Sequence, residues 1–344
     1  MKKRALISGG AGFIGCNAAH RLIHAGWDVV VWDNLARRGG DKNLDWLRTL
    51  GGFSFCRVDL RDEQQVYSHY RGNHFDLVLH CAGQVAVTTS VANPRDDFEC
   101  NAMGSFNLLE AIRAYDRDAM MIFASTNKVY GSMQDIHVVE RNGRYEYASL
   151  PMGISEAHPL DFHSPYGCSK GAADQYVRDY ARIYGLATVS FRQSCVYGYR
   201  QFGIEDQGWV AWFVIAHALG RPITIYGDGK QTRDILFIDD LIDAYLLAYE
   251  RRNRTAGQIY NIGGGPENQL SLIELMQILK QAKGNEAEHA FAAWRPGHQK
   301  VFVADIRKAK TDLGWEPAHT CRQGVEKLIA WVDANPDLFS VSGH

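Results

Sequence analysis

The chain has 344 residues, a hydrophobic content of 46% and a formal net charge of −2. This length allows one large domain or two smaller ones, and the composition is typical of a globular enzyme. The charge balance gives no indication of a nucleic-acid or membrane surface, and no apolar run approaches the roughly 18 residues of a membrane-spanning helix.

The seven cysteines are scattered along the chain, and none of them forms a Cys-x-x-Cys pair. This pattern argues against a disulfide framework and against a zinc site. It is typical of a protein in a reducing compartment, so we expect a cytoplasmic location and no bound metal.

The first predicted unit is a buried strand, a glycine-rich turn, a helix and a second strand. The strands cover residues 5–8 and 29–32, the turn covers residues 9–15, and Asp33 follows eighteen residues after the last glycine of the turn. This order is typical of a dinucleotide-binding unit, in which the glycines let the backbone approach a pyrophosphate at the helix N-terminus. The carboxylate would then bind the adenine-ribose hydroxyls.

Asp33 also bears on the choice between NAD and NADP. A carboxylate at this strand end repels the 2′-phosphate of NADP, whereas Arg37 and Arg38 follow closely and could accept one. We favour NAD because the acid lies at the strand end itself, and we expect the two arginines on a solvated loop.

Further strands are predicted at residues 53–57, 77–80, 120–124 and 187–192, with helices between them. One of these helices opens at Pro94 and runs to residue 115. The alternation predicts a Rossmann-type α/β fold, a doubly wound parallel sheet covered on both faces. Functional groups of such sheets gather at the carboxyl ends of the strands.

Two residues at predicted strand ends have two open interpretations each. Asp59 follows the third strand and either bonds the adenine amino group or caps the next helix. Thr126 follows the fifth strand and either bonds a substrate hydroxyl or caps the strand end.

A loop-like stretch from about residue 131 to residue 161 leads into a helix that runs to residue 184. Ser164 is the predicted N-cap and Pro165 the first helical residue. Tyr166 and Lys170 lie four residues apart on this helix, so their side chains share one face. A cation near a phenol favours the phenolate, which is the form that can accept a proton.

Beyond residue 192 the alternation becomes irregular and predicts a smaller lobe. Helices are expected at 209–219, 239–250, 306–313 and 322–332, strands at 224–226 and 259–262, and a capping box at 271–274 opens a helix to residue 280. We therefore expect residues 1–192 to form mainly a dinucleotide domain. Residues 193–344 would form mainly a substrate-binding lobe, with some segments returning to the sheet.

Several motifs occur along the chain in the same order as in one known family. They are the glycine turn with Asp33, Asn101, Ser125-Thr126 before Val129-Tyr130-Gly131, the Tyr166/Lys170 pair, and Arg295-Pro296-Gly297-His298-Gln299. On these residues the chain resembles the extended short-chain dehydrogenase/reductases that act on nucleotide sugars. Segments 83–90, 125–131, 161–170 and 206–210 are similar to those of epimerases of CDP-linked sugars.

The resemblance implies a bound NAD and a nucleotide-diphosphate sugar, with binding residues for each. Those for NAD are Gly9, Gly12, Phe13, Ile14, Gly15, Asp33, Asn34, Asp59, Leu60, Ala82, Gly83, Gln84, Asn101, Ser125, Tyr166 and Lys170. Those for the nucleotide sugar are Thr88, Thr126, Asn127, Lys128, Arg200, Gln201, Gln207, Trp209, Tyr226, Arg233 and Arg295. Trp209 or Tyr226 could stack on the base.

The implied reaction is an epimerisation that is redox-neutral overall, with CDP as the expected carrier and carbon 2 as the expected position. Tyr166 would take the proton of a sugar hydroxyl, and Thr126 would share it. Lys170 would hold the nicotinamide ribose and lower the pKa of Tyr166. Arg233 and Arg295 would clamp the diphosphate, or else form surface ion pairs.

Two positions depart from the patterns of the family. Asn127-Lys128 stands where its dehydratases carry Asp-Glu, which favours epimerisation without loss of water. Lys128 then either stabilises a keto oxygen or faces solvent. His298 replaces a common Asp, and the role of that position stays open.

Three other functions remain open at this point. They are a 4-epimerase of UDP-sugars, a reductase that consumes NADH, and a regulator that binds NAD without turnover. The family also implies a homo-oligomer, a dimer or a tetramer, with helices at 93–115 and 166–184 as the candidate interface.

Overall fold

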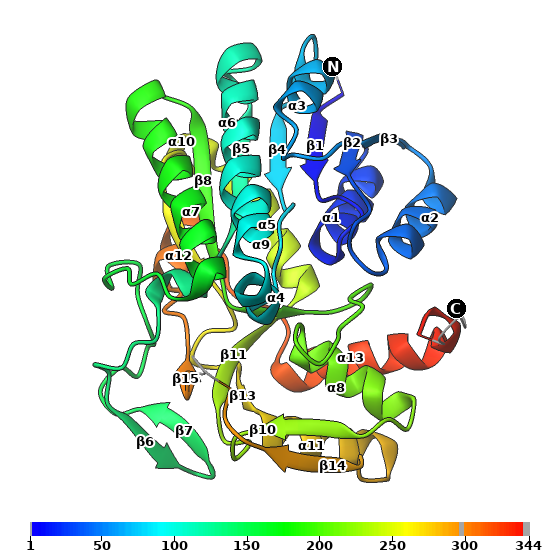
Figure 1. The fold of residues 1–344 in the computed structure, drawn as a ribbon, viewed down its shortest axis with the longest axis vertical. Helices are drawn as coiled ribbons and strands as arrows, with labels where there is room; N and C mark the ends of the chain where they lie inside the picture. Colours follow the sequence, from blue (N-terminus) through cyan, green and yellow to red (C-terminus); the bar gives the residue numbers. More distant parts are fainter. Residues whose placement is uncertain (1, 296–298, 340–344) are drawn as a thin grey trace.

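The structure is a computed structural model that describes residues 2–295 and 299–339. Among these residues the centre is a seven-stranded parallel sheet of order β12-β8-β5-β4-β1-β2-β3 (Figure 1). Its strands are β1 (Arg4–Ser8), β2 (Asp28–Asp33), β3 (Phe53–Arg57), β4 (Leu77–His80), β5 (Met120–Thr126), β8 (Ala187–Gln193) and β12 (Ile259–Ile262). The predicted Rossmann-type sheet is confirmed.

Helices cover both faces of this sheet. One face carries α1 (Phe13–His24), α2 (Gly40–Leu50) and α9 (Ile238–Glu250), and the other carries α3 (Glu63–Tyr70), α6 (Gly104–Tyr115) and α7 (Ser164–Tyr184). Successive strand residues point to opposite faces, so Ile7 and Val31 join one core while Leu6 and Val30 join the other. Both cores are apolar because a parallel sheet is covered on each side.

The predicted helix from Pro94 to residue 115 is confirmed, but it contains a π turn that the sequence did not indicate. The chain forms α5 (Pro94–Phe98), then a π-helical turn, η1 (Glu99–Met103), and only then α6. A short helix that the sequence reasoning missed, α4 (Val87–Ala92), precedes them. A π turn re-aims the side chains within it, and here it contains Asn101.

The stretch predicted as a loop contains a β-hairpin. Its strands are β6 (Val138–Arg141) and β7 (Arg144–Tyr147), which pair antiparallel. The two turn residues, Asn142 and Gly143, both have positive φ, as an Asn-Gly hairpin turn requires. That dipeptide was the signal in the sequence for this hairpin.

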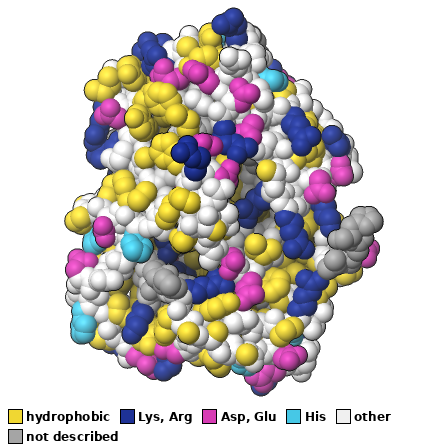
Figure 2. Space-filling view, viewed as in Figure 1, with side chains coloured by type: hydrophobic (Ala, Val, Ile, Leu, Met, Phe, Trp, Pro, Cys, Tyr) yellow, Lys and Arg dark blue, Asp and Glu magenta, His cyan; other side chains and the backbone are white. Residues whose placement is uncertain are grey.

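The C-terminal lobe lies below the central sheet in Figure 1. Its strands are β9 (Cys195–Tyr197), β11 (Thr232–Phe237), β13 (Gln269–Ser271) and β15 (Val301–Phe302) in one sheet, and β10 (Ile223–Tyr226) with β14 (His289–Ala292) in another. Its helices include α8 (Trp209–Ala218), α11 (Leu272–Lys283) and α13 (Cys321–Ala334). Figure 2 shows a hollow across the middle of this face, with Lys and Arg side chains beside it.

The chain returns from this lobe to the central sheet, where β12 pairs with β8. The short helices α10 (Arg252–Thr255) and α12 (Arg307–Leu313) lie beside that edge, and η3 (Pro336–Leu338) follows α13. The domain boundary at residue 192 stays a prediction.

Candidate active site

The glycine turn between β1 and α1 leaves no room for side chains. A Cβ on Gly9 would lie 2.6 Å from the backbone N of Ala82, and one on Gly15 would overlap the backbone O of Gly9. Phe13 and Ile14 form the first turn of α1, whose N–H groups have no partner within the helix. A turn of this shape fits the close approach of a pyrophosphate.

The Asp33 carboxylate lies against this turn. It accepts hydrogen bonds from the backbone N–H of Ala11 at 3.0 Å and of Leu35 at 2.7 Å. Burial raises the pKa of Asp33, and these hydrogen bonds oppose that rise. The acid is therefore fixed beside the glycine turn, where a ribose diol of a dinucleotide fits.

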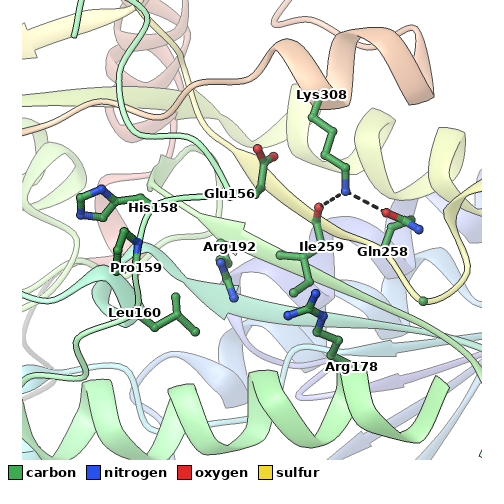
Figure 3. Close-up of a pocket in the computed structure, with 10 residues that line it drawn as sticks. Glu156, His158, Pro159, Leu160, Arg178, Arg192, Gln258, Ile259 and Lys308 are labelled. Carbon is green, nitrogen blue, oxygen red and sulfur yellow. Dashed lines mark hydrogen bonds between the residues drawn. The ribbon is translucent and has the colours of Figure 1, made fainter. Parts of the chain in front are cut away.

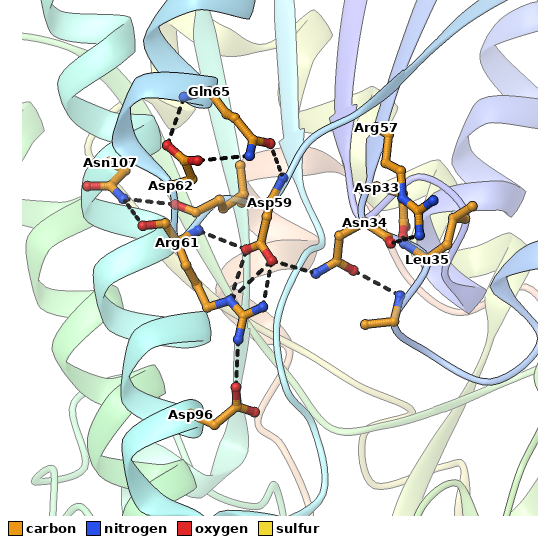
Figure 4. A network of polar contacts seen from close by, with 12 residues as sticks. Asp33, Asn34, Leu35, Arg57, Asp59, Arg61, Asp62, Gln65, Asp96 and Asn107 are labelled. Carbon is orange, nitrogen blue, oxygen red and sulfur yellow. Dashed lines mark hydrogen bonds and ion pairs between the residues drawn. The ribbon is translucent and has the colours of Figure 1, made fainter.

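The next polar cluster joins the ends of β2 and β3 (Figure 4). Asn34 donates to Asp59 at 3.1 Å, and Arg61 pairs with the same carboxylate at 2.6 Å. The hydrogen bonds from Arg61 lower the pKa of Asp59 to about 2. Asp62, and not Asp59, caps α3 by accepting from the backbone N–H of Gln65. The capping interpretation of Asp59 is wrong, and its adenine interpretation stays a prediction.

Leu60 is buried beside this cluster, and its backbone oxygen accepts from Asn107 at 2.8 Å. This contact joins the loop after β3 to α6. The position of the predicted cofactor residues around Asp59 therefore depends on both neighbouring elements.

Two residues that the sequence reasoning missed, Asp97 and Ser169, connect the loop after β4 with α7. The Asp97 carboxylate accepts from Gln84 at 2.8 Å, from Asn101 at 3.1 Å and from Ser169 at 2.5 Å. The network orients Asn101 and the start of the helix that carries Tyr166. Nothing in the local sequence around Asp97 pointed to it.

Two buried polar atoms near these residues have no partner, the Oδ1 of Asn101 and the Oγ of Ser125. A Cβ on Gly83 would lie 2.5 Å from that Asn101 oxygen and 3.8 Å from the Nζ of Lys170. Together with the glycine turn and Asp33, these atoms fit a polar cofactor along the carboxyl ends of the strands. The predicted NAD residues therefore fit NAD.

Thr126 is the last residue of β5 and lies against Tyr166. Its Oγ1 accepts from the backbone N–H of Lys128 at 3.2 Å, as a cap for η2 (Asn127–Tyr130). Thr126 also forms a side-chain hydrogen bond with Tyr166 that favours the phenolate. The strand-end cap interpretation is confirmed, and the same hydroxyl is placed beside the predicted base.

Burial raises the pKa of Tyr166 to about 12, against the opposing effects of Thr126 and of the positive charge of Arg37. The predicted lowering of this pKa by Lys170 is wrong for this arrangement. The Nζ of Lys170 donates to the backbone O of Ala124 at 2.6 Å, and burial lowers its own pKa to about 8. Desolvation of the phenol outweighs the charges around it.

Arg37 lies on an exposed loop, as expected, but it also makes a long-range contact. Its guanidinium donates to the Oε1 of Gln207, which lies across the cleft in the loop before α8. Its charge also acts on Tyr166. The sequence feature that precedes this contact is the position of Arg37, four residues after Asp33, in the loop that lies over the glycine turn.

The helix that carries Tyr166 begins close to the predicted residue. α7 starts at Ser164, with Pro165 in its first turn, and the Oγ of Ser164 accepts from the backbone N–H of Gly167 at 3.2 Å. The N-cap position falls on His163, one residue earlier than predicted, which is within the usual spread of helix boundaries.

Two cations predicted to bind substrate meet at Gln299. Lys128 donates to its Oε1 at 3.1 Å, and Arg233 donates to its backbone O at 2.7 Å. The indole of Trp209 packs against Phe213. Burial raises the pKa of the Cys195 thiol, and the nearby Arg233 and Trp209 oppose that rise. Lys128 comes from the turn after β5, whereas Cys195 and Arg233 come from β9 and β11 of the lobe.

Arg295 forms an ion pair, which is the second of the two roles expected for it. Its guanidinium lies 3.7 Å from the ring centroid of Tyr226 and pairs with Asp206 at 2.8 Å. The hydroxyl of Tyr226 in turn donates to Glu205 at 2.7 Å. The clamp role of Arg295 stays a prediction. The adjoining residues 296–298, His298 among them, lie outside the described residues.

The remaining predicted substrate residues are spread around the cleft. Arg200 lies over the ring of Trp46 at 4.3 Å, which is a packing position. Gln201 is buried with its Oε1 unpaired, Thr88 is exposed on α4, and Asn127 is buried beside Thr126. The structure therefore brings Lys128 and Arg233 together, whereas Arg200 packs elsewhere.

A separate cavity of about 310 Å³ opens beside β12, and no predicted site residue lines it (Figure 3). Arg178, Arg192 and Lys308 line it together with Glu156. Arg192 is paired with Asp174 at 2.8 Å, and Lys308 donates to the backbone O of Ile259 at 2.6 Å.

The described residues contain no helix long and apolar enough to cross a bilayer, and no group of three His, Cys, Asp or Glu side chains that could hold a metal.

Comparison with known proteins identifies relatives along nearly the whole chain. Residues 5–263 match the family described as NAD dependent epimerase/dehydratase. The chain is 44% identical to a CDP-paratose 2-epimerase of Salmonella typhi, over 96% of this chain and 99% of that protein.

Two solved structures are also similar to the chain. A UDP-glucose 4-epimerase of Thermotoga maritima with UDP-glucose has a TM-score of 0.83, at 30% identity over 97% of this chain and 99% of that chain. A UDP-glucose 4-epimerase of Thermus thermophilus in complex with NAD has a TM-score of 0.79, at 34% identity over 95% of this chain and 98% of that chain.

Proposed function

The chain belongs to the NAD dependent epimerase/dehydratase family, and on that premise we propose that it inverts carbon 2 of a CDP-linked sugar. The family confirms the predicted NAD cofactor and the resemblance to nucleotide-sugar epimerases. The similarity to the Salmonella enzyme supports the CDP carrier and the carbon.

One structural observation carries the proposal. Tyr166 and Thr126 share a hydrogen bond at the carboxyl end of β5, and Lys170 reaches the same strand end from the next turn of α7. Lys128, two residues after β5, and Arg233 of the lobe meet nearby at Gln299. The arrangement can therefore hold a charged sugar nucleotide with a hydroxyl at the proton acceptor.

The chain's own residues handle the proton of the reaction. Tyr166 accepts the proton of the sugar hydroxyl as the C–O bond becomes a carbonyl, and Thr126 holds the same oxygen by a hydrogen bond. When bound at the carboxyl ends of the strands, NAD would supply the hydride chemistry, acceptance and return, that makes the cycle redox-neutral. Tyr166 then gives the proton back, so that no net oxidation remains.

A panel of CDP- and UDP-hexoses tests this proposal, with the inverted carbon located by proton NMR. We expect inversion at carbon 2 of a CDP-sugar without net change in NADH absorbance. Inversion only at carbon 4 of a UDP-sugar would instead assign the function of the Thermotoga and Thermus relatives, and net NADH consumption would indicate a reductase.

A regulator that binds NAD without turnover is the alternative from another class. The intact set of Thr126, Tyr166 and Lys170 favours catalysis over it. If no sugar nucleotide is converted while NAD binds, the regulator becomes the better description.

We also propose that the protein is a homodimer through the face of α6 and α7. Tyr176 and Ile183 on α7 are 48% and 66% exposed, and Phe98 at the end of α5 is 52% exposed. Figure 2 shows apolar side chains gathered at the upper left, where α7 ends in Figure 1. Large exposed apolar patches mark interaction surfaces.

Light scattering after size exclusion tests this interface. We expect a dimer for the native protein and a monomer for Ile183→Glu, because a buried carboxylate has no partner there. Gln281→Glu, at an exposed position of α11 beside Arg322, adds the same single negative charge and is the matched control that should stay dimeric. A native monomer, or a dimeric Ile183→Glu, would place the interface elsewhere or remove it.

A further inference from the structure

Two positively charged side chains from the two sides of the cleft converge on one residue. Lys128 belongs to η2, directly after the catalytic strand β5, and Arg233 belongs to β11 of the C-terminal lobe. Both are half-buried, and both donate to Gln299, Lys128 to the side-chain oxygen and Arg233 to the backbone oxygen. The second arm of Arg233 donates to the backbone O of Thr232 at 2.7 Å.

All of these acceptors are neutral. In the part of the chain that the structure describes, the ion pairs include neither Lys128 nor Arg233. The carboxylate next in sequence, Asp234, accepts instead from the backbone N–H of Gly265 and Ala304. The neighbouring residues 296–298 are Pro, Gly and His, which carry no carboxylate.

Among the described residues, the charged or titratable groups that act on Lys128 include no carboxylate. It faces Arg233 from β11, the thiol of Cys195 from β9, and the amide of Gln299. Burial and the charge of Arg233 together lower the pKa of Lys128 to about 8. The charge of Asp234 acts on Arg233, but neither cation has a carboxylate as a hydrogen-bond partner, so a bound dianion would stabilise both.

We propose that Lys128 binds the diphosphate of the sugar nucleotide alongside Arg233, for which the family resemblance already implies this contact. This inference rests on the proposed function. A diphosphate brings two negative groups to the two cations, and charge-assisted bonds replace the neutral contacts with Gln299. With its ammonium group bound to the phosphate, Lys128 would not contact the keto oxygen.

The position of Lys128 links phosphate binding to the chemistry. Its backbone N–H donates to the Oγ1 of Thr126, two residues earlier, so that one short turn carries both the phosphate contact and the hydroxyl at Tyr166. A keto-sugar must present both faces of one carbon in turn. An anchored phosphate gives the ring a fixed point about which to rotate.

Calorimetric binding of CDP to the NAD-loaded protein tests the assignment, because CDP contains the diphosphate and no sugar ring beyond its ribose. We expect Lys128→Gln to weaken CDP binding at least about tenfold at pH 7 and Lys128→Arg to restore most of it. Lys308→Gln, which removes a half-buried lysine at the separate cavity, is the matched control and should bind CDP as the native protein does.

The pH dependence gives a second readout. Because the free protein loses the Lys128 proton above about pH 8, native CDP affinity should fall from there upward. Lys128→Arg should lack this fall between pH 8 and pH 10, since a guanidinium keeps its proton. In Lys128→Gln/Arg233→Gln the two losses should be less than additive if both residues bind the same diphosphate.

The opposite results would separate the two proposals. If Lys128→Gln binds CDP like the native protein but turns over slowly, Lys128 acts at the sugar and the diphosphate assignment is overturned. If the native protein binds neither CDP nor UDP, the proposed function fails and takes the assignment with it. Melting temperatures of all variants show whether a loss comes from misfolding.

Discussion

The cofactor side and the substrate side of the cleft differ in how their polar groups are held. On the cofactor side, backbone N–H groups fix Asp33, and the glycine turn admits no side chain. On the substrate side, protein groups occupy the cations that would bind a diphosphate, as Asp206 does for Arg295. The first side is already shaped for its ligand, whereas the second must exchange partners to bind.

This difference matches the roles of the two ligands. A cofactor that stays bound through a redox-neutral cycle benefits from a rigid site, because little ordering has to occur on binding. A substrate that enters and leaves benefits when its binding residues make contacts of similar strength in the free and in the bound protein.

Tyr166→Phe should have the largest effect, since Tyr166 serves both sides. Loss of the proton acceptor should lower turnover by about a hundredfold to ten-thousandfold, while the purified protein keeps its NAD. Turnover by NMR and NAD content by absorbance after denaturation measure the two quantities. Turnover near the native value would contradict the assignment of Tyr166 as the base.

Gly15→Ala should break the rigid side. The new Cβ would overlap the backbone O of Gly9, and relaxation of the turn should cost roughly 1–3 kcal/mol, which weakens NAD binding by about five- to hundredfold. Gly40→Ala is the control, because its Cβ would make only ordinary contacts of 3.8 Å or more. Equal NAD affinity in the two variants would show that the turn is not rigid.

Arg37→Gln should sharpen the contrast through pH. The phenolate of Tyr166 is the reactive form, and burial raises its pKa to about 12, so turnover should increase with pH through the neutral range. Removing the charge of Arg37 should raise this pKa further and lower turnover at pH 7 by a few-fold. Arg38→Gln is the neighbouring control, and equal pH profiles for the two variants would count against a role of Arg37 at Tyr166.

Asp206→Asn should have the smallest effect and the opposite sign. It removes the partly exposed ion pair with Arg295, and such pairs contribute about 0.2–1 kcal/mol. If the diphosphate competes with Asp206 for this guanidinium, CDP affinity should increase by up to about fivefold. Weaker CDP binding would show instead that Asp206 contacts the nucleotide.

The central fold was predictable because its signals are local. The strands of the central sheet up to β8, namely β1, β2, β3, β4, β5 and β8, are short, largely apolar runs between turn residues, and Ser271 with Glu274 forms the predicted capping box. The structure differs from the prediction where one local sequence pattern is compatible with two backbone conformations. Residues 94–115 have a helical pattern throughout, yet the chain there includes a π turn at Asn101.

The candidate site was predictable only where a motif carries it. Thr126, Tyr166 and Lys170 come from a recognised order of motifs, and the structure brings them to one strand end. Arg37 and Asp97 act through contacts with residues far along the chain, and no local pattern marks such contacts. The direction of the Tyr166 pKa depends on burial, which four-residue spacing does not reveal.

The return of β12 to the central sheet has a consequence for how the cleft can open. The chain passes between sheet and lobe from β8 to β9, from β11 to α9 and again from β12 to β13. A hinge would have to bend all of these connections together, so the two halves should move as one rigid body. Access for a ligand then depends on side chains and the loop before α8, and thermal unfolding should proceed in a single cooperative step.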